Sequence, residues 1–168
     1  MQSRVFTVYL SLGSNIKSRV GNLNYGIEKL NKSTQINVTN ISSIYETQPL
    51  YVENQDDFLN MVIEITTTLS PDNLLQFTKH IEQESGRKLN THNLPRTLDI
   101  DILAYDNQII NTENLVIPHP KLNERKFVLE PWAQIAPNLK LPKLNISIVR
   151  LLEITEDCSR VMLYKEKN

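Results

Sequence analysis

The sequence predicts an α+β fold: a ferredoxin-like βαββαβ core, with one sheet and helices packed on one face, followed by additional C-terminal helices. Two observations lead to this prediction. Segments with the two-residue period of strands alternate with helix-periodic segments in the order strand, helix, strand, strand, helix, strand. The 168 residues also contain no internal repeat, low-complexity tract or linker, so one domain spanning residues 1–168 is expected.

The first half of the core contains three strands and one helix. Residues 4–12 are rich in β-branched and aromatic side chains, which is typical of a strand. Apolar residues then recur at spacings of four and three from Ile16 to Leu30, which forms one face of a helix. Residues 36–44 alternate apolar and polar side chains, and residues 58–69 form a longer apolar run. Both segments are therefore predicted to be strands.

The second helix has a distinct start signal. Ser70 can cap the free N–H groups of the first turn, Pro71 has no N–H to leave unpaired there, and Asp72 lies near the positive end of the helix. Gly86 can adopt the left-handed conformation that ends a helix. Residues 98–105 (LDIDILAY) then predict the last strand of the core.

The remaining residues predict shorter elements. Two helical segments, residues 124–130 and 132–136, are expected to be broken at Pro131, because proline lacks the N–H that a helix interior requires. A helix around residues 146–154 and a last strand at residues 161–164 follow.

Composition excludes some classes of protein without revealing the chemistry. The chain has 18 Lys and Arg against 19 Asp and Glu, which argues against a broad nucleic-acid surface but leaves room for a local phosphate site. Its one cysteine, Cys158, suits a reducing compartment. The apolar stretches are far shorter than the roughly 20 residues that span a bilayer. We therefore expect a cytoplasmic protein that binds neither nucleic acid nor membrane. A monomer is a separate expectation, which the composition does not decide.

A pair of carboxylates, Asp99 and Asp101, lies inside an apolar strand segment. Residues two apart in a strand point to the same face, with Cα atoms about 6.5–7 Å apart. Two such carboxylates can hold one hard cation, or bridge two cations about 3.5–4 Å apart. Pairs of this kind are more often a solvated polar face. The apolar neighbours make an unpaired carboxylate costly here, so a positive partner is expected.

Positive groups occur on both sides of this pair. Arg87 and Arg96 precede it, and His119, between two prolines, and Arg125 follow it. The planar fork of arginine suits phosphate oxygens, although single surface arginines are commonly only solvated. No glycine begins a Walker-type phosphate loop. Acids for a metal and arginines for phosphates suggest nucleotide-polyphosphate chemistry, and the spacing alone leaves a solvated surface equally open.

The segments that carry these residues resemble the 6-hydroxymethyl-7,8-dihydropterin pyrophosphokinase family of folate biosynthesis. The matching segments are YLSLGSN at 9–15, SSIYETQPL at 42–50, FLNMVIEI at 58–65, PRTLDIDILAY at 95–105 and IPHPKLNERKFVLEP at 117–131. They are colinear over about four-fifths of the chain. The resemblance implies transfer of the diphosphate of ATP to the hydroxyl of 6-hydroxymethyl-7,8-dihydropterin, giving AMP and the pterin diphosphate.

The resemblance also implies roles for single residues. Asp99 and Asp101 would bind two Mg²⁺ ions with ATP as co-substrate, and Arg87 and Arg96 would be catalytic phosphate clamps. The ATP-binding set would comprise Glu82, Arg87, Arg96, Ile102, His119 and Arg125, and the pterin-binding set Thr47, Leu50, Phe58, Asn60 and Phe127. A flat heterocycle suits aromatic faces and an amide that reads its edge. Without the resemblance, Phe58 and Phe127 would be expected in the core.

Three segments depart from the family pattern. Asn-Leu at 93–94 replaces a usual Trp-Gly, Lys-Leu at 88–89 lacks a second arginine, and Gln-Pro-Leu-Tyr at 48–51 replaces Pro-Pro-Leu-Gly. These changes put the rate and the shape of inhibitors in doubt, but not the class of reaction. The loops 47–57 and 86–96 are expected to be mobile without ligand and to close over both substrates.

Two other classes of protein share part of this pattern. A ferredoxin-like RNA-binding module would require aromatic residues on a central strand and a basic surface, and neither is visible. A metal-dependent phosphatase could use the same pair of acids. It would release phosphate from ATP without a pterin, whereas a pyrophosphokinase would release AMP only with one.

Overall fold

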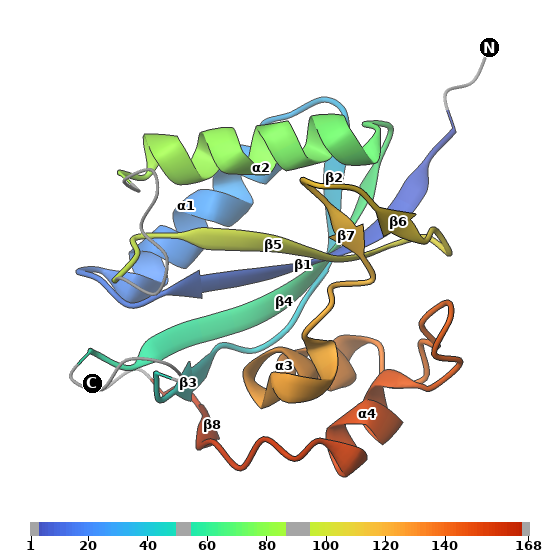
Figure 1. Ribbon diagram of the computed structural model, residues 1–168. Coiled ribbons are helices and arrows are strands. Elements are labelled where there is room, and N and C mark those ends of the chain that lie inside the picture. Colours follow the sequence, from blue (N-terminus) through green and yellow to red (C-terminus); the bar gives the residue numbers. More distant parts are fainter. Residues whose placement is uncertain (1–3, 50–54, 87–94, 166–168) are drawn as a thin grey trace.

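The computed structural model describes residues 4–49, 55–86 and 95–165, and its core has the predicted ferredoxin-like order of elements (Figure 1). The strands are β1 (Phe6–Ser14), β2 (Ile36–Ile41), β3 (Tyr45–Thr47), β4 (Phe58–Thr67), β5 (Asp99–Tyr105), β6 (Ile110–Asn111), β7 (Val116–Ile117) and β8 (Val161–Leu163). The helices are α1 (Arg19–Asn31), α2 (Pro71–Glu84), the 3-10 turn η1 (Leu122–Glu124), α3 (Lys126–Ile135) and α4 (Ile148–Ile154).

An antiparallel sheet forms the middle of the molecule. β1 lies between β5 and β4, the other edge of β4 pairs with both β2 and β3, and β8 pairs with β3. Residues 36–44, predicted as one strand, are divided between β2 and the segment before β3. At the division Ser42 forms two hydrogen bonds with Val62. Its N–H donates to the Val62 carbonyl and its Oγ accepts the Val62 N–H, both at 2.9 Å.

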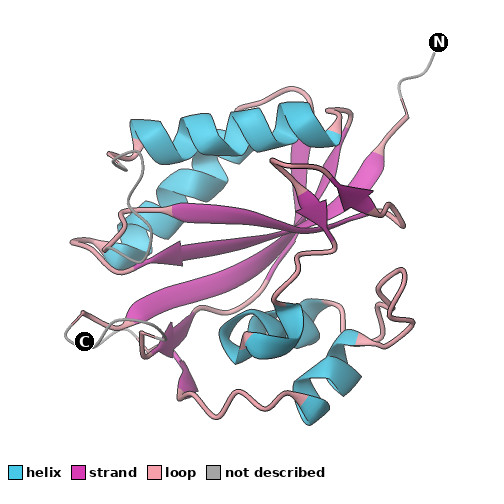
Figure 2. Ribbon diagram, in the orientation of Figure 1, coloured by secondary structure: helices cyan, strands magenta, loops and turns pink. Residues whose placement is uncertain are grey.

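The two helices of the core, α1 and α2, pack on one face of the sheet as predicted, and the additional C-terminal helices α3 and α4 cover the other face (Figure 2). α1 and α2 enclose a core with Leu10 of β1, whereas α3 and α4 enclose a second core with the adjacent residue Tyr9. The same division holds in β4, where Val62 and Ile63 enter different cores. Tyr9 and Val62 bring apolar surface to the second face as well, so this face also requires a cover.

The start and end of α2 agree with the prediction. The Asn73 N–H donates to Ser70 Oγ at 3.3 Å, Pro71 is the first helical residue, and Gly86 follows the helix with a φ of +94°. No helix within the described ranges is both long and apolar enough to cross a membrane.

The expected break at Pro131 is wrong, because α3 continues through this residue to Ile135. A proline inside a helix removes one hydrogen bond and costs about 3 kcal/mol. Trp132 is buried in the core between α3 and the sheet, and the adjacent Pro131 is also buried. Burial of this apolar surface offsets the lost hydrogen bond, so the helix persists.

Candidate active site

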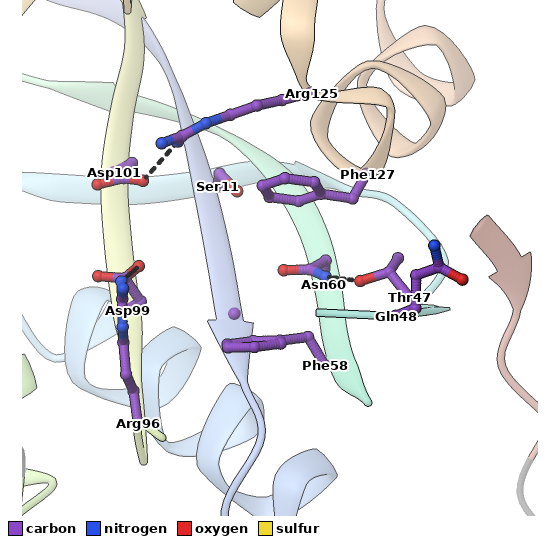
Figure 3. A pocket seen from close by; sticks show the side chains of 11 residues that line it. Ser11, Thr47, Gln48, Phe58, Asn60, Arg96, Asp99, Asp101, Arg125 and Phe127 are labelled. Atoms are coloured by element: carbon purple, nitrogen blue, oxygen red, sulfur yellow. Dashed lines mark hydrogen bonds and ion pairs between the residues drawn. The ribbon is translucent and has the colours of Figure 1, made fainter. Parts of the chain in front are cut away.

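The two predicted metal ligands lie on one face of β5. Asp99 and Asp101 point towards the side of the sheet covered by α3, whereas Ile100 and Ile102 enter the core beneath α1 and α2 (Figure 3). The Asp99 side chain is 21% exposed and that of Asp101 is 38% exposed. The alternation of the strand therefore brings both carboxylates to a cavity, where they remain accessible to a ligand.

Each carboxylate has the positive partner that the sequence led us to expect. Arg96 Nη1 lies 2.5 Å from Asp99 Oδ2, and Arg125 Nη1 lies 3.5 Å from Asp101 Oδ2. Within the described part of the chain, the buried Nε of Arg125 has no hydrogen-bond partner. Two acids and two arginines thus form a compact group of nearly balanced charge at the cavity.

Asn15 anchors Arg96 beside the cavity. The Arg96 N–H donates to Asn15 Oδ1 at 2.7 Å, and the Asn15 N–H donates to the Arg96 carbonyl at 3.1 Å. Asn15 Nδ2 also donates to Gln55 Oε1 at 3.1 Å. Asn15, which is 3% exposed, therefore joins the end of β1 to the segments before β4 and β5. Sequence reasoning did not assign this role to it, because nothing in its local pattern shows these distant contacts.

A cavity with a volume of about 660 Å³, open mouth included, contains both charged pairs and an aromatic region. The lining residues are Ser11, Gly13, Thr47, Gln48, Phe58, Asn60, Arg96, Asp99, Asp101, Arg125 and Phe127. Eight of these were predicted as site residues, and Ser11, Gly13 and Gln48 were not.

The register of the sheet explains why the charged and aromatic regions adjoin. Gly13 of the central strand lies opposite Asp99 on one side and opposite Asn60 on the other. Ser11 likewise lies opposite Asp101. Because these two residues of β1 are small, the floor between the acids and Asn60 is open. The sequence feature that indicates this open floor is a pair of small residues, Ser11 and Gly13, two apart in a predicted strand.

Asn60 has a fixed orientation at the centre of the cavity. Its Nδ2 donates to Thr47 Oγ1 at 2.7 Å, and both residues are buried. Its Oδ1 points the other way, since a Cβ added to Gly13 would lie only 2.8 Å from this oxygen. Phe58 and Phe127 lie on opposite sides of Asn60 (Figure 3). The cavity thus offers a carbonyl acceptor between two aromatic rings.

His119 lies after a cis peptide bond at Pro118, and its N–H donates to the Leu103 carbonyl at 3.0 Å. Its Nδ1 accepts the Lys121 N–H at 3.3 Å. Burial, together with the nearby charge of Arg125, lowers the pKa of His119 to about 4. The imidazole is therefore neutral near pH 7.

We expect His119 to make the protein less stable in mild acid. Its folded pKa of about 4 lies below the ordinary value of 6.5, so the unfolded chain takes up the proton first as the pH falls. The free energy of unfolding should decrease between these two values. In urea denaturation at pH 7 and pH 4.5, His119→Asn should lose less stability than the wild type. Parallel losses in the two proteins would contradict this assignment.

Two other predicted residues lie away from the cavity lining. Ile102 is 4% exposed in the core beneath α1 and α2. Glu82 of α2 is 7% exposed, and its Oε1 accepts the Ile100 N–H at 2.6 Å. Both lie on the side of β5 opposite the two acids. Their expected contact with ATP is not tested by the structure and stays a prediction.

Leu50 and Arg87 lie outside the described residues. So do the departures at residues 88–89 and 93–94, and residues 50–54 and 87–94 of the two loops that were expected to close. Their predicted roles are therefore unchanged.

Fold and cavity together define a class: a ferredoxin-like α+β protein whose cleft joins an acid–arginine region to an aromatic region. The sequence profile of the family described as 7,8-dihydro-6-hydroxymethylpterin-pyrophosphokinase (HPPK) matches residues 9–137. The chain belongs to this family and is a pyrophosphokinase of folate biosynthesis.

Relatives in several organisms agree with this assignment. The chain is 45% identical over 132 residues to the 2-amino-4-hydroxy-6-hydroxymethyldihydropteridine pyrophosphokinase of Bacillus subtilis, covering 79% of each. It is 43% identical over 136 residues to the enzyme of that name in Aquifex aeolicus, covering 81% of this chain and 84% of the relative. Neither the RNA-binding nor the phosphatase alternative is supported by these relatives.

Longer proteins contain a similar region. The chain is 42% identical over 144 residues to the folic acid synthesis protein FOL1 of Dictyostelium discoideum, but spans only 22% of it. The crystal structure of Plasmodium falciparum HPPK-DHPS aligns with a TM-score of 0.73 at 16% identity, over 90% of this chain and 44% of that one. At this low identity the structural likeness shows the fold alone, and it confirms the α+β fold class.

Proposed function

We propose that the cavity binds ATP and 6-hydroxymethyl-7,8-dihydropterin side by side, and that Asp99 and Asp101 hold two Mg²⁺ ions at the ATP. The observation that supports this proposal most strongly is the row of residues across the sheet. Asp99 is opposite Gly13, and Gly13 is opposite Asn60, so the acids adjoin the aromatic region directly. A pterin hydroxymethyl group between them would face the triphosphate.

The carboxylates suit Mg²⁺ that is bound together with ATP. No group of three or more His, Cys, Asp or Glu residues within the described ranges could hold a metal by itself. Mg²⁺ commonly keeps several waters and is bound by one or two carboxylates plus substrate phosphates. Asp99 and Asp101 match that donor set. Bound Mg²⁺ would neutralise the negative charge of the phosphates.

Arg96 and Arg125 would exchange carboxylate partners for phosphate oxygens when ATP binds. Their ion pairs hold both guanidinium groups at the cavity, and the Asn15 contacts fix the Arg96 backbone. Phosphoryl transfer depends mainly on positioning and charge stabilisation, so these residues act without a covalent intermediate. Arg87 would assist them as a second phosphate clamp.

The aromatic region would hold the pterin. Phe58 and Phe127 would stack on its two faces, and Asn60 Oδ1 would accept a hydrogen bond from an N–H of the ring. Thr47 would keep the Asn60 amide in this orientation through its Oγ1. The hydroxyl would then lie towards Asp99 and Asp101, where the β-phosphate of ATP is expected.

We expect Gly13→Ala to weaken pterin binding selectively. The new Cβ would lie 2.8 Å from Asn60 Oδ1 and force the amide to move. Loss of one well-formed hydrogen bond should raise the KM for the pterin by about tenfold, with a smaller change in the KM for ATP. Gly21→Ala is a suitable control, since Gly21 is exposed on α1 and the one atom closer than 3 Å to the new Cβ, Ser18 Oγ at 2.5 Å, belongs to an exposed side chain that can turn away. Equal changes in both KM values would contradict the placement of the pterin at Asn60.

Calorimetric titration of Mg²⁺ tests the proposed metal site. We expect weak binding to the protein alone and two ions per chain in the presence of α,β-methylene-ATP, an analogue that cannot be cleaved at the bond concerned. Asp101→Asn should reduce the number or the affinity of these ions. Saturation at a single ion, or equally tight binding without nucleotide, would contradict the proposal.

A further inference from the structure

A C-terminal segment, residues 155–164, connects two walls of the cavity, and we name it the strap. It follows α4 and includes β8, and it lies outside the residues that match the family profile. Figure 1 shows it running from α4 below the sheet to the sheet edge beside β3. One end of the strap contacts the start of α3, and the other contacts β3 and the segment before β4.

The first contact supplies the cap of α3. The residue before this helix, Arg125, makes no side-chain cap, so the first N–H groups need an acceptor from elsewhere. Asp157 Oδ2 accepts the Lys126 N–H at 2.8 Å. A carboxylate is also favoured at the positive end of a helix. Asp157 thus fixes the turn that carries two cavity residues, Arg125 and Phe127.

The Asp157 carboxylate is itself held in place. Its Oδ1 accepts the Ser159 N–H at 2.8 Å, and Thr155 Oγ1 donates to the Asn123 carbonyl at 2.7 Å. Burial would raise the pKa of Asp157, but the hydrogen bonds from Ser159 and from the Lys126 N–H lower it overall. The group is therefore charged at neutral pH, as an anionic cap requires.

The second contact fixes the opposite wall. Val161 lies opposite Thr47 in the β8–β3 pairing, and the Tyr164 N–H donates to the Ile44 carbonyl at 2.9 Å. Arg160 Nη2 lies 2.6 Å from Asp57 Oδ2, and Asp57 precedes the cavity residue Phe58. The strap is therefore bonded on both sides of the proposed pterin site.

We propose that the strap is a positioning element of the pterin site, in which Asp157 sets Phe127 on one wall and Arg160 and β8 set Phe58 and Thr47 on the other. This inference rests on the proposed function of the cavity. The two aromatic rings come from elements far apart in the sequence, and their separation determines how well a flat ring fits between them. A contact to both elements from one short segment keeps that separation constant.

Steady-state kinetics on the full chain tests this role. Asp157→Ala should raise the KM for the pterin by about tenfold, on the order of a lost helix cap, with kcat changed less than threefold. Asp157→Asn keeps an acceptor for the Lys126 N–H and should restore most of the lost affinity. Arg160→Ala should raise the same KM by a smaller factor, because its side chain is 57% exposed.

Ser147→Ala is the matched control, since Ser147 Oγ caps α4 by accepting the Arg150 N–H and α4 contributes no residue to the cavity. It should lower the melting temperature without changing the KM for the pterin. If Asp157→Ala changes only the melting temperature, as Ser147→Ala does, the strap has a purely structural role and the inference is wrong. If the wild-type protein forms no AMP in response to the pterin, the proposed function fails instead.

Discussion

Replacing Asp99 or Asp101 by alanine should reduce turnover by at least about a thousandfold. A bound metal ion that neutralises charge in the transition state lowers the free energy of that state by several kcal/mol, and either variant would lose this stabilisation. Both side chains are partly exposed at the cavity, so their removal leaves no buried cavity in the core. The fold should therefore be retained, as checked by circular dichroism and thermal unfolding. Asp99→Asn and Asp101→Asn should have similar effects, because an amide is a weak ligand for Mg²⁺.

Asp106→Asn provides the control for both variants. Asp106 follows β5, accepts the Thr7 N–H at 2.8 Å and lies outside the cavity lining. Its φ of 44° is a conformation that asparagine tolerates well. This variant should retain wild-type activity. A kcat within tenfold of the wild type for Asp99→Ala or Asp101→Ala would show that the metal role is wrong.

The second large effect is expected at Arg96. Arg96→Ala should lower kcat by about 10²–10³-fold if the guanidinium meets charge that develops in the transition state. The Asn15 contacts involve only the Arg96 backbone and should persist in the variant. Arg96→Lys should recover part of the activity, since lysine keeps the charge but not the planar fork.

Arg150→Ala is the control for Arg96→Ala, because Arg150 pairs with Glu153 on the surface of α4 and its side chain is 63% exposed. It should leave kcat unchanged. If Arg96→Ala raises only the KM for ATP, Arg96 would bind ATP and the transition state equally, and its catalytic role would be wrong.

Much of the fold could be predicted because side-chain periodicity reports which face of an element is buried. The alternation in 98–105 predicted that Asp99 and Asp101 share a face, and the Ser70-Pro71 signal located the start of α2. Pro131 was misjudged because local propensity takes no account of tertiary burial. The C-terminal helices were predicted but the face that they cover was not, since local periodicity does not show which element packs against a strand.

The charged residues of the cavity were easier to predict than the residues that hold them in position. An acid pair in an apolar strand demands a positive partner, and arginines near it in the sequence were the obvious candidates. The contacts of Asn15 with Arg96 and of Asp157 with Lys126 join segments 81 and 31 residues apart, which no local pattern can show. From the residues alone, Phe127 also looked like a core residue, because a cavity-lining ring and a buried ring have the same periodicity.

The near-neutral net charge of −1 also has a structural explanation. Arg96 and Arg125 are paired with the two acids of the same cavity, so the site carries little excess charge of its own. In the proposed complex, Mg²⁺ supplies the additional positive charge that the triphosphate requires. A phosphate-binding site therefore does not require a basic protein.

The most direct test of the central claim is the formation of AMP from ATP and Mg²⁺, measured with and without 6-hydroxymethyl-7,8-dihydropterin. We predict that AMP appears only when both Mg²⁺ and the pterin are present, with one AMP for each pterin diphosphate. AMP formed at the same rate without the pterin, or free phosphate released in its place, would contradict this account.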